Sequence, residues 1–182
     1  NTVIASQVLL ASNRDGHTVM LPGNSHVLVP YLSKAPLPFD SLKDFAPVAS
    51  LARTGLFLVV HPALPAKSVR ELIALAKARP GELNFGTSGA GNSVHIAGEM
   101  FRNMTGVNIV RINYKGATQA LRDLLGGRVE LMFGVPGSVM PHVKSGKLRA
   151  LAVTSAQPSP LAPGLPTVAE TVPGFESGSY IG

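Results

Sequence analysis

The sequence predicts an α/β fold in which strands, loops and helices alternate along most of the chain. Hydrophobic residues make up 45% of the 182 residues, enough to bury a substantial core. β-rich runs and helical patterns follow one another in at least four successive units, which is typical of a parallel or mixed sheet covered by helices. Frequent turns are expected, because the chain holds 19 Gly and 15 Pro.

The chain begins with a helical pattern. Apolar residues over 2–14 are spaced as in a helix, and Asp15-Gly16 ends it as a turn. Residues 18–21 predict a short strand, which a turn joins to a helical turn over 27–32. After Arg53–Gly55 the strand and helix signals become denser, so we expect a lobe boundary there.

A buried strand and a capped helix come next. The β-rich runs at 46–50 and 56–61 predict strands, and the second is apolar enough to be buried on both faces. Ser68 suits the N-cap of a helix over 69–78, with Glu71 at the third helical position of a capping box. This helix opens the regular part of the fold.

The remaining chain repeats the strand–loop–helix pattern and ends in a proline-rich stretch. Residues 158–173 hold five prolines and predict a stiff surface connection with a brief helix at 168–171. The strands and the helices that follow them are predicted at 83–86 and 93–104, 109–112 and 117–125, and 129–133 and 137–144, with a last strand at 148–154.

Composition excludes several classes of site. The absence of Cys rules out disulfides, thiolate zinc sites and a cysteine nucleophile. No apolar run reaches the roughly 20 residues of a membrane-spanning helix. The net charge of +6 favours an anionic partner, but the positive residues are scattered and aromatics are only 5%, so nucleic acid is not the expected partner.

The loop after the strand at 83–86 is the richest candidate site. Open sheets bind ligands at the carboxyl ends of parallel strands, where backbone N–H groups and the dipole of the next helix favour negative charge. Glycines let the backbone approach such a ligand, and hydroxyls and an amide add donors. A carboxylate site is one interpretation; the other is that Asn92 or Ser93 only caps the helix. The candidate residues are Thr87, Ser88, Gly89, Gly91, Asn92 and Ser93.

Two further turns supply polar groups. Tyr114-Lys115-Gly116 follows the strand at 109–112, so its hydroxyl, ammonium or amides could reach the same edge of the sheet. Gly23, Asn24, Ser25 and His26 follow the strand predicted at 18–21. The alternatives are a solvated turn for Lys115 and a β-turn for the segment that ends at His26.

An enzyme is the alternative class. Ser88 or Ser93 with His95 could form a hydrolase site, but no carboxylate is evidently placed to orient the histidine. The loop fits neither the nucleophile elbow nor the dinucleotide fingerprint. His95 and Glu99 have metal-compatible spacing without a third ligand. We therefore predict no catalytic residue and no metal site.

Many short motifs, taken together and in order, resemble the substrate-binding receptors of tripartite tricarboxylate transporters, the Bug proteins. They cover essentially the whole chain. The motifs are Asp15-Gly16-His17-Thr18, residues 43–48 (KDFAPV), residues 65–72 (PAKSVREL), Gly86-Thr87-Ser88-Gly89 with His95 and Gly98-Glu99, Tyr114-Lys115-Gly116, residues 126–129 (GGRV), residues 146–154 (GKLRALAVT), residues 165–170 (LPTVAE) and residues 173–176 (PGFE).

The resemblance implies a two-lobed fold like that of type II periplasmic binding proteins. Such a receptor is monomeric, carries no cofactor, closes on a small organic acid and delivers it to membrane permease subunits. It also implies a periplasmic location, with a signal peptide expected upstream. In this frame residues 1–55 are a partial first lobe, 56–177 the second lobe and 178–182 the start of the return to the first. The chain would then be a fragment that lacks both ends of the first lobe.

The resemblance also implies where the ligand lies. Its carboxylate is held between two strand-to-helix loops, one of which corresponds here to Thr87–Ser93, while His95, Tyr114–Gly116 and Gly23–His26 line the remaining cleft. Many relatives carry Asp where this chain has Gly134. A ligand amine is therefore disfavoured, and a dicarboxylate, tricarboxylate or aromatic carboxylate is the expected ligand.

Overall fold

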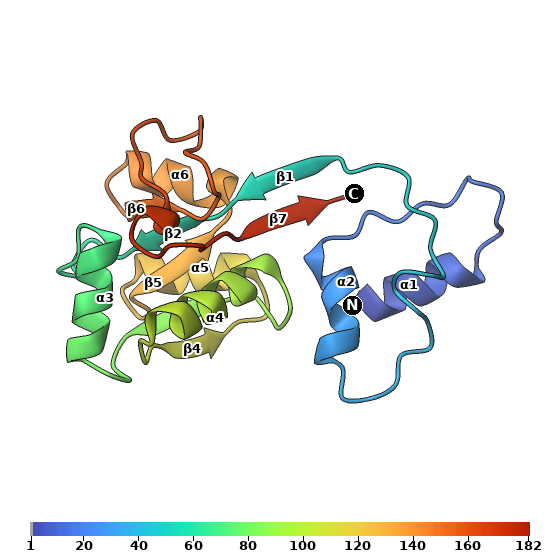
Figure 1. The fold of residues 1–182 in the computed structure, drawn as a ribbon, viewed down its shortest axis with the longest axis horizontal. Helices are drawn as coiled ribbons and strands as arrows, with labels where there is room; N and C mark the ends of the chain where they lie inside the picture. The colour runs from blue at the N-terminus through green and yellow to red at the C-terminus, as the bar shows by residue number, and fades with distance from the viewer. Residues whose placement is uncertain (1) are drawn as a thin grey trace. The chain divides into compact units, whose positions relative to one another are not determined.

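A computed structural model describes residues 2–182 and divides into two units (Figure 1). Unit 1 comprises the chain up to Arg53 together with Ser179–Gly182, and unit 2 comprises Thr54–Gly178. Helices and a mixed sheet confirm the α/β class that the sequence predicts. That the two units are the two lobes of a receptor stays a prediction.

Unit 1 is organised around two helices and a buried histidine. Helix α1 (Thr2–Ala11) contacts helix α2 (Asn24–Leu32). His26 is 6% exposed, and its ring centroid lies 4.7 Å from that of Phe45 in an edge-on contact. Its two nitrogens lie 3.2 Å from the Ser6 hydroxyl and from the Ser41 carbonyl oxygen. His26 therefore belongs to the small core of this unit.

Two predicted strands are wrong. Residues 18–21 and 46–50 are irregular, and Val19, Leu21 and Val48 are 74%, 64% and 87% exposed. Within residues 2–182 no strand pairs with either run, so their β propensity has neither a ladder nor a packed face to act on.

The structure also has elements that the sequence did not predict. Strands β1 (Ala52–Gly55) and β7 (Gly178–Ile181) pair as a two-stranded sheet. Helix α2 begins at Asn24, so the polar segment expected as a loop or turn is mostly the first turn of a helix that follows Gly23.

Unit 2 contains a five-stranded sheet in the order β4-β3-β5-β2-β6. β3 is parallel to both of its neighbours, whereas β2 is antiparallel to β5 and to β6. The carboxyl ends of β3, β4, β5 and β6 therefore lie at one edge. The strands are β2 (Phe57–Val60), β3 (Asn84–Thr87), β4 (Val110–Asn113), β5 (Leu131–Gly134) and β6 (Arg149–Val153).

Helices cover both faces of this sheet. The ring of Phe85 packs against α4, whereas a Cβ on the next residue, Gly86, would lie 3.3 Å from Ala120 in α5. Because successive strand residues point to opposite faces, α4 and α5 lie on opposite sides of β3. The helices are α3 (Val69–Ala78), α4 (Ser93–Thr105), α5 (Ala117–Leu125), α6 (Pro136–Lys144) and the 3-10 turn η1 (Val168–Glu170).

The core of unit 2 agrees closely with the sequence pattern. All residues of β2 are buried, as expected for a strand covered on both faces. Ser68 caps α3 by accepting the Glu71 N–H at 3.1 Å, so the predicted capping residue is confirmed. Phe101, Phe133 and Phe175 form an aromatic cluster. No helix in residues 2–182 combines the length and apolar character needed to span a bilayer.

Candidate functional site

The loop between β3 and α4, residues 88–92, lies at the carboxyl edge of the sheet. β3 ends at Thr87, paired with Asn113 at the end of β4, and α4 begins at Ser93. The loop is compact because Gly89 and Gly91 adopt positive φ angles of 103° and 79°. The predicted strand-to-helix position of this loop is confirmed.

Many polar groups of the β3–α4 loop bond to one another. Asn92 caps α4: its Oδ1 accepts the His95 N–H at 2.9 Å, and its Nδ2 donates to the carbonyl oxygen and the hydroxyl of Ser88 at 2.6 and 2.9 Å. Asn113 Oδ1 accepts the Gly89 N–H at 3.1 Å and the Thr87 hydroxyl at 3.2 Å. These donors hold the loop in shape instead of facing a ligand.

Several backbone donors remain. The N–H groups of Ser88, Ala90, Ser93 and Val94 donate no hydrogen bond within residues 2–182. Two of them are the first N–H groups of α4, where the helix dipole adds partial positive charge. Because the Asn92 cap satisfies the third N–H, the first two are left to an outside acceptor. The capping interpretation and the anion interpretation are therefore compatible.

His95 lies under the loop in a cluster of charged groups. Its Nδ1 accepts the Gly91 N–H at 3.1 Å, and its Nε2 contacts Arg111 Nη1 and lies 3.7 Å from Glu99 Oε1. Glu99 also pairs with Arg102 at 2.9 Å and with Arg111 at 3.5 Å. Burial, and then the positive charge of Arg111, lower the pKa of His95, whereas Glu99 opposes this shift. Burial and Arg111 therefore favour the neutral ring, which is turned into the protein.

The hydrolase alternative has no support in this geometry. No hydrogen bond joins His95 to Ser88 or to Ser93 anywhere in the described chain. Both ring nitrogens instead have other neighbours, so the histidine is not available as a base for either hydroxyl. Over the same residues no group of three His, Cys, Asp or Glu side chains is arranged to hold a metal ion.

The β4–α5 turn brings its amides, but not its tyrosine, to the same edge. The Tyr114 hydroxyl donates to Asp123 Oδ2 at 2.8 Å. Burial, followed by this hydrogen bond, raises the pKa of Tyr114 to about 12. Lys115 is exposed, and Gly116 is the N-cap of α5 without a side-chain cap. The first two N–H groups of α5 likewise lack a partner in the described residues, which leaves backbone donors beside the exposed Lys115.

The other predicted residues have different roles. A Cβ on Gly134 would lie 2.3 Å from Val139 Cγ1, so α6 packs against this glycine and leaves no room for an aspartate. In unit 1, Asn24 Oδ1 accepts the Tyr180 N–H at 2.8 Å, and the Ser25 hydroxyl lies 2.9 Å from that of Thr2.

Asn113 is the residue of this site that sequence reasoning missed. The available signal was a polar residue at the end of a strand.

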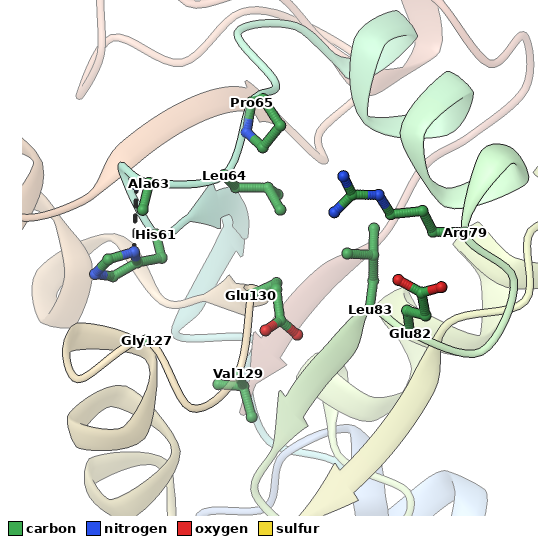
Figure 2. A pocket seen from close by; sticks show the side chains of 10 residues that line it. All are labelled: His61, Ala63, Leu64, Pro65, Arg79, Glu82, Leu83, Gly127, Val129 and Glu130. Carbon is green, nitrogen blue, oxygen red and sulfur yellow. Dashed lines mark hydrogen bonds between the residues drawn. The ribbon is translucent and has the colours of Figure 1, made fainter.

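A separate cavity of about 360 Å³ opens at the opposite edge of the sheet (Figure 2). It lies where β2 ends and where β3 and β5 begin. Glu130 Oε2 accepts the Asn84 N–H at 2.6 Å, and the His61 ring accepts the Ala63 N–H at 3.3 Å. The carboxylates of Glu82 and Glu130 line this cavity against the single guanidinium of Arg79, so it is a poor site for a carboxylate ligand. Its lining residues are His61, Ala63, Leu64, Pro65, Arg79, Glu82, Leu83, Gly127, Val129 and Glu130.

Comparison with known proteins gives consistent matches along the chain. The model of the tripartite tricarboxylate transporter receptor family matches residues 1–182 of this chain. Protein BugT of Bordetella pertussis is 40% identical over 169 residues, which are 92% of this chain and 52% of BugT. The chain spans about half the length of the curated relatives that it matches over most of its own length.

Solved structures give the same picture. An R. palustris protein with adipate has a TM-score of 0.89 and 37% identity, and the match covers 98% of this chain and 60% of that protein. Periplasmic binding protein BugD has a TM-score of 0.87 at 29% identity, covering 99% and 60% of the two chains. MatC from Rhodopseudomonas palustris with bound malate has a TM-score of 0.85 at 25% identity, covering 99% and 62%.

Proposed function

The chain belongs to the tripartite tricarboxylate transporter receptor family, and from this premise we propose that it forms part of a periplasmic receptor for a small organic carboxylate. The family and the similar solved structures are solute-binding proteins and not enzymes. We propose further that the bound acid is passed to the permease subunits of a tripartite transporter, and that a signal peptide precedes the chain in the complete protein.

The unpartnered N–H groups at the start of α4 carry this proposal. They lie at the carboxyl edge of the sheet, beside a loop in which many polar atoms are paired with one another. Neutral dipoles held in place stabilise a carboxylate without a formal salt bridge. The proposed contacts are the N–H groups of Ser88, Ala90, Ser93 and Val94, with the Ser88 and Ser93 hydroxyls.

We propose a dicarboxylate without an amino group as the preferred ligand. Two similar proteins were solved with adipate and with malate, both of which are dicarboxylates. Lys115 and the first N–H groups of α5 give this edge a second group of donors for the other carboxylate. Gly134 offers no charge to an ammonium group. Residues 23–25 of unit 1 remain proposed contacts, whereas His26 has no free ring nitrogen.

Isothermal titration calorimetry tests the proposal. The complete protein that carries this chain is titrated with adipate, malate, citrate and benzoate, with aspartate as the amino-bearing control. We expect binding of at least one acid well below millimolar Kd and weaker binding of aspartate. Absence of binding across the panel would contradict the proposed function.

Two substitutions at one position isolate the backbone donor. Ser93→Ala keeps the N–H of the first helical residue and loses the hydroxyl, whereas Ser93→Pro loses both. Proline is tolerated there because this N–H has no partner in the helix and Asn92 is extended, with φ of −83° and ψ of 168°. A charge-assisted hydrogen bond is worth about 1.5–3 kcal/mol, so we expect roughly tenfold to hundredfold weaker binding for Ser93→Pro than for Ser93→Ala. Equal affinities would remove this amide from the site.

A further inference from the structure

His95 closes a reciprocal pair of hydrogen bonds around the start of α4. Its backbone N–H donates to the Asn92 cap at 2.9 Å, and its ring reaches back to accept the N–H of Gly91 at 3.1 Å. A capping box has the same form, with the third helical side chain returning to the backbone before the helix. Here a histidine takes the place of the usual Glu or Gln.

The ring is held on its other side by charged groups of two elements. Arg111 of β4 contacts Nε2, and Glu99 of α4 lies 3.7 Å from the same nitrogen. Arg102 of α4 faces Glu99 in turn. A neutral imidazole accepts at one nitrogen only. With Nδ1 accepting from Gly91, Nε2 carries the proton and faces the Glu99 carboxylate, while Arg111 lies against the same nitrogen as a positive charge and not as a hydrogen-bond donor to it. A ring that accepts at Nδ1 and carries its proton on Nε2 is a neutral ring.

We propose that His95 is a positioning residue that holds the β3–α4 loop in its carboxylate-binding form by accepting the Gly91 N–H. The inference rests on the proposed function. Gly91 stands between Ala90 and Asn92, next to the donors proposed for the ligand. With Gly91 tied to α4, these neighbouring N–H groups stay at the mouth of β3 without binding one another.

Protonation of His95 removes this bond. A proton on Nδ1 would face the Gly91 N–H with a second donor, and it would add positive charge beside Arg111. Burial and Arg111 hold the pKa of His95 below its ordinary value of 6.5, so the loop keeps its form at neutral pH. Carboxylate affinity should therefore fall as the pH drops through this lowered pKa, on the acid side of 6.5.

The test compares adipate binding by wild-type, His95→Asn and His95→Leu forms of the complete protein from about pH 5 to about pH 8. Asn places an oxygen where Nδ1 stood but does not titrate, whereas Leu has no acceptor. We expect roughly tenfold weaker binding for H95L, because one hydrogen bond is lost, and recovery of most of the affinity in H95N. The ionisation of adipate affects all variants equally, so the ratio of wild-type to H95N affinity isolates the histidine.

Two charge variants test the direction in which the acid loss of binding should shift. Arg111→Gln removes the charge that lowers the His95 pKa, so the acid loss of binding should move to higher pH. Glu99→Gln removes the charge that raises it, so the loss should move to lower pH. Wild-type affinity in H95L, or a wild-type to H95N ratio that does not change with pH, would overturn the positioning role.

A ligand-free measurement separates this inference from the proposed function. Hydrogen exchange of the Gly91 amide, followed by NMR, should be slow in the wild type and in H95N but fast in H95L. If no variant binds any carboxylate, the proposed function has failed, and the exchange rates still decide the role of His95. Equal Gly91 exchange in the wild type and H95L would show that the ring does not hold the loop.

Discussion

The ring of Phe85 occupies the space that a side chain on Gly98 would need. A Cβ on Gly98 would lie 2.2 Å from Cε2 of Phe85, which is 0% exposed. The helix that begins at the β3–α4 loop is thus packed directly on the strand that leads into it. This close contact fixes both ends of the loop, so its unpartnered N–H groups are presented by a rigid support.

Gly98→Ala should destabilise unit 2 because neither the ring nor the strand can move without disturbing the core. Overpacking of this kind costs about 1–3 kcal/mol. Gly137→Ala is the matched control: this glycine is also helical, but an added Cβ meets nothing within 4 Å. It should raise the free energy of unfolding by about 0.5–1 kcal/mol through helix propensity. Urea denaturation measures both, and a neutral G98A would contradict the packing.

The regular half of the fold could be predicted because local signals and tertiary structure agree there. The helix over 69–78 has its cap, its amphipathic face and a buried strand to cover, and it was predicted with its true bounds. Residues 18–21 have the β propensity of a strand. A strand also needs a partner strand, however, and no strand within 2–182 pairs with these residues. The antiparallel place of β2 between β5 and β6 is likewise a long-range pairing.

The candidate site was predicted in position but not in detail. Glycines and hydroxyls after β3 indicated the right loop, because a strand-to-helix turn needs them. Which atoms remain free depends on hydrogen bonds to distant residues: Asn113 takes two donors of the loop, and Asp123 takes the Tyr114 hydroxyl. His95 was expected at the ligand, whereas its ring points into the cluster with Arg111. Such partners follow from the fold and not from local spacing.

Gly134→Ala should be strongly destabilising in the wild-type background and much less so beside Val139→Ala. The added Cβ would lie 2.3 Å from Val139 Cγ1, and a valine in a helix has few rotamers with which to move away. Each single variant should cost about 1–3 kcal/mol, the first by overpacking and the second by leaving a cavity. A double-mutant cycle by urea denaturation should show the pair costing less than the sum. Simple additivity would contradict the contact.

Asn92 should show separable effects on stability and on binding. Asn92→Ala loses the cap of α4 and the tether to Ser88, so the free energy of unfolding should fall by about 1 kcal/mol. Asn92→Asp keeps an oxygen for the His95 N–H and should retain most of this stability. Its negative charge, however, lies beside the proposed carboxylate, so adipate binding measured by calorimetry should weaken more in N92D than in N92A. The reverse order of affinities would argue against an anion at this helix end.

The ionisation of Tyr114 should be delayed. Burial and the hydrogen bond to Asp123 raise its pKa from 10.0 to about 12, so between these values the folded state keeps a proton that the unfolded state releases. The stabilisation is therefore complete below about pH 10 and is lost as the pH rises towards 12. Absorbance of tyrosinate against pH should show this late phase in the wild type and not in Tyr114→Phe. That variant should also be less stable at neutral pH by about 1 kcal/mol, because one hydrogen bond is lost.

Asp123→Asn keeps the tyrosine but removes the neighbouring negative charge, so the late phase of Tyr114 should shift to lower pH. An unchanged titration in D123N would mean that the carboxylate does not hold the hydroxyl.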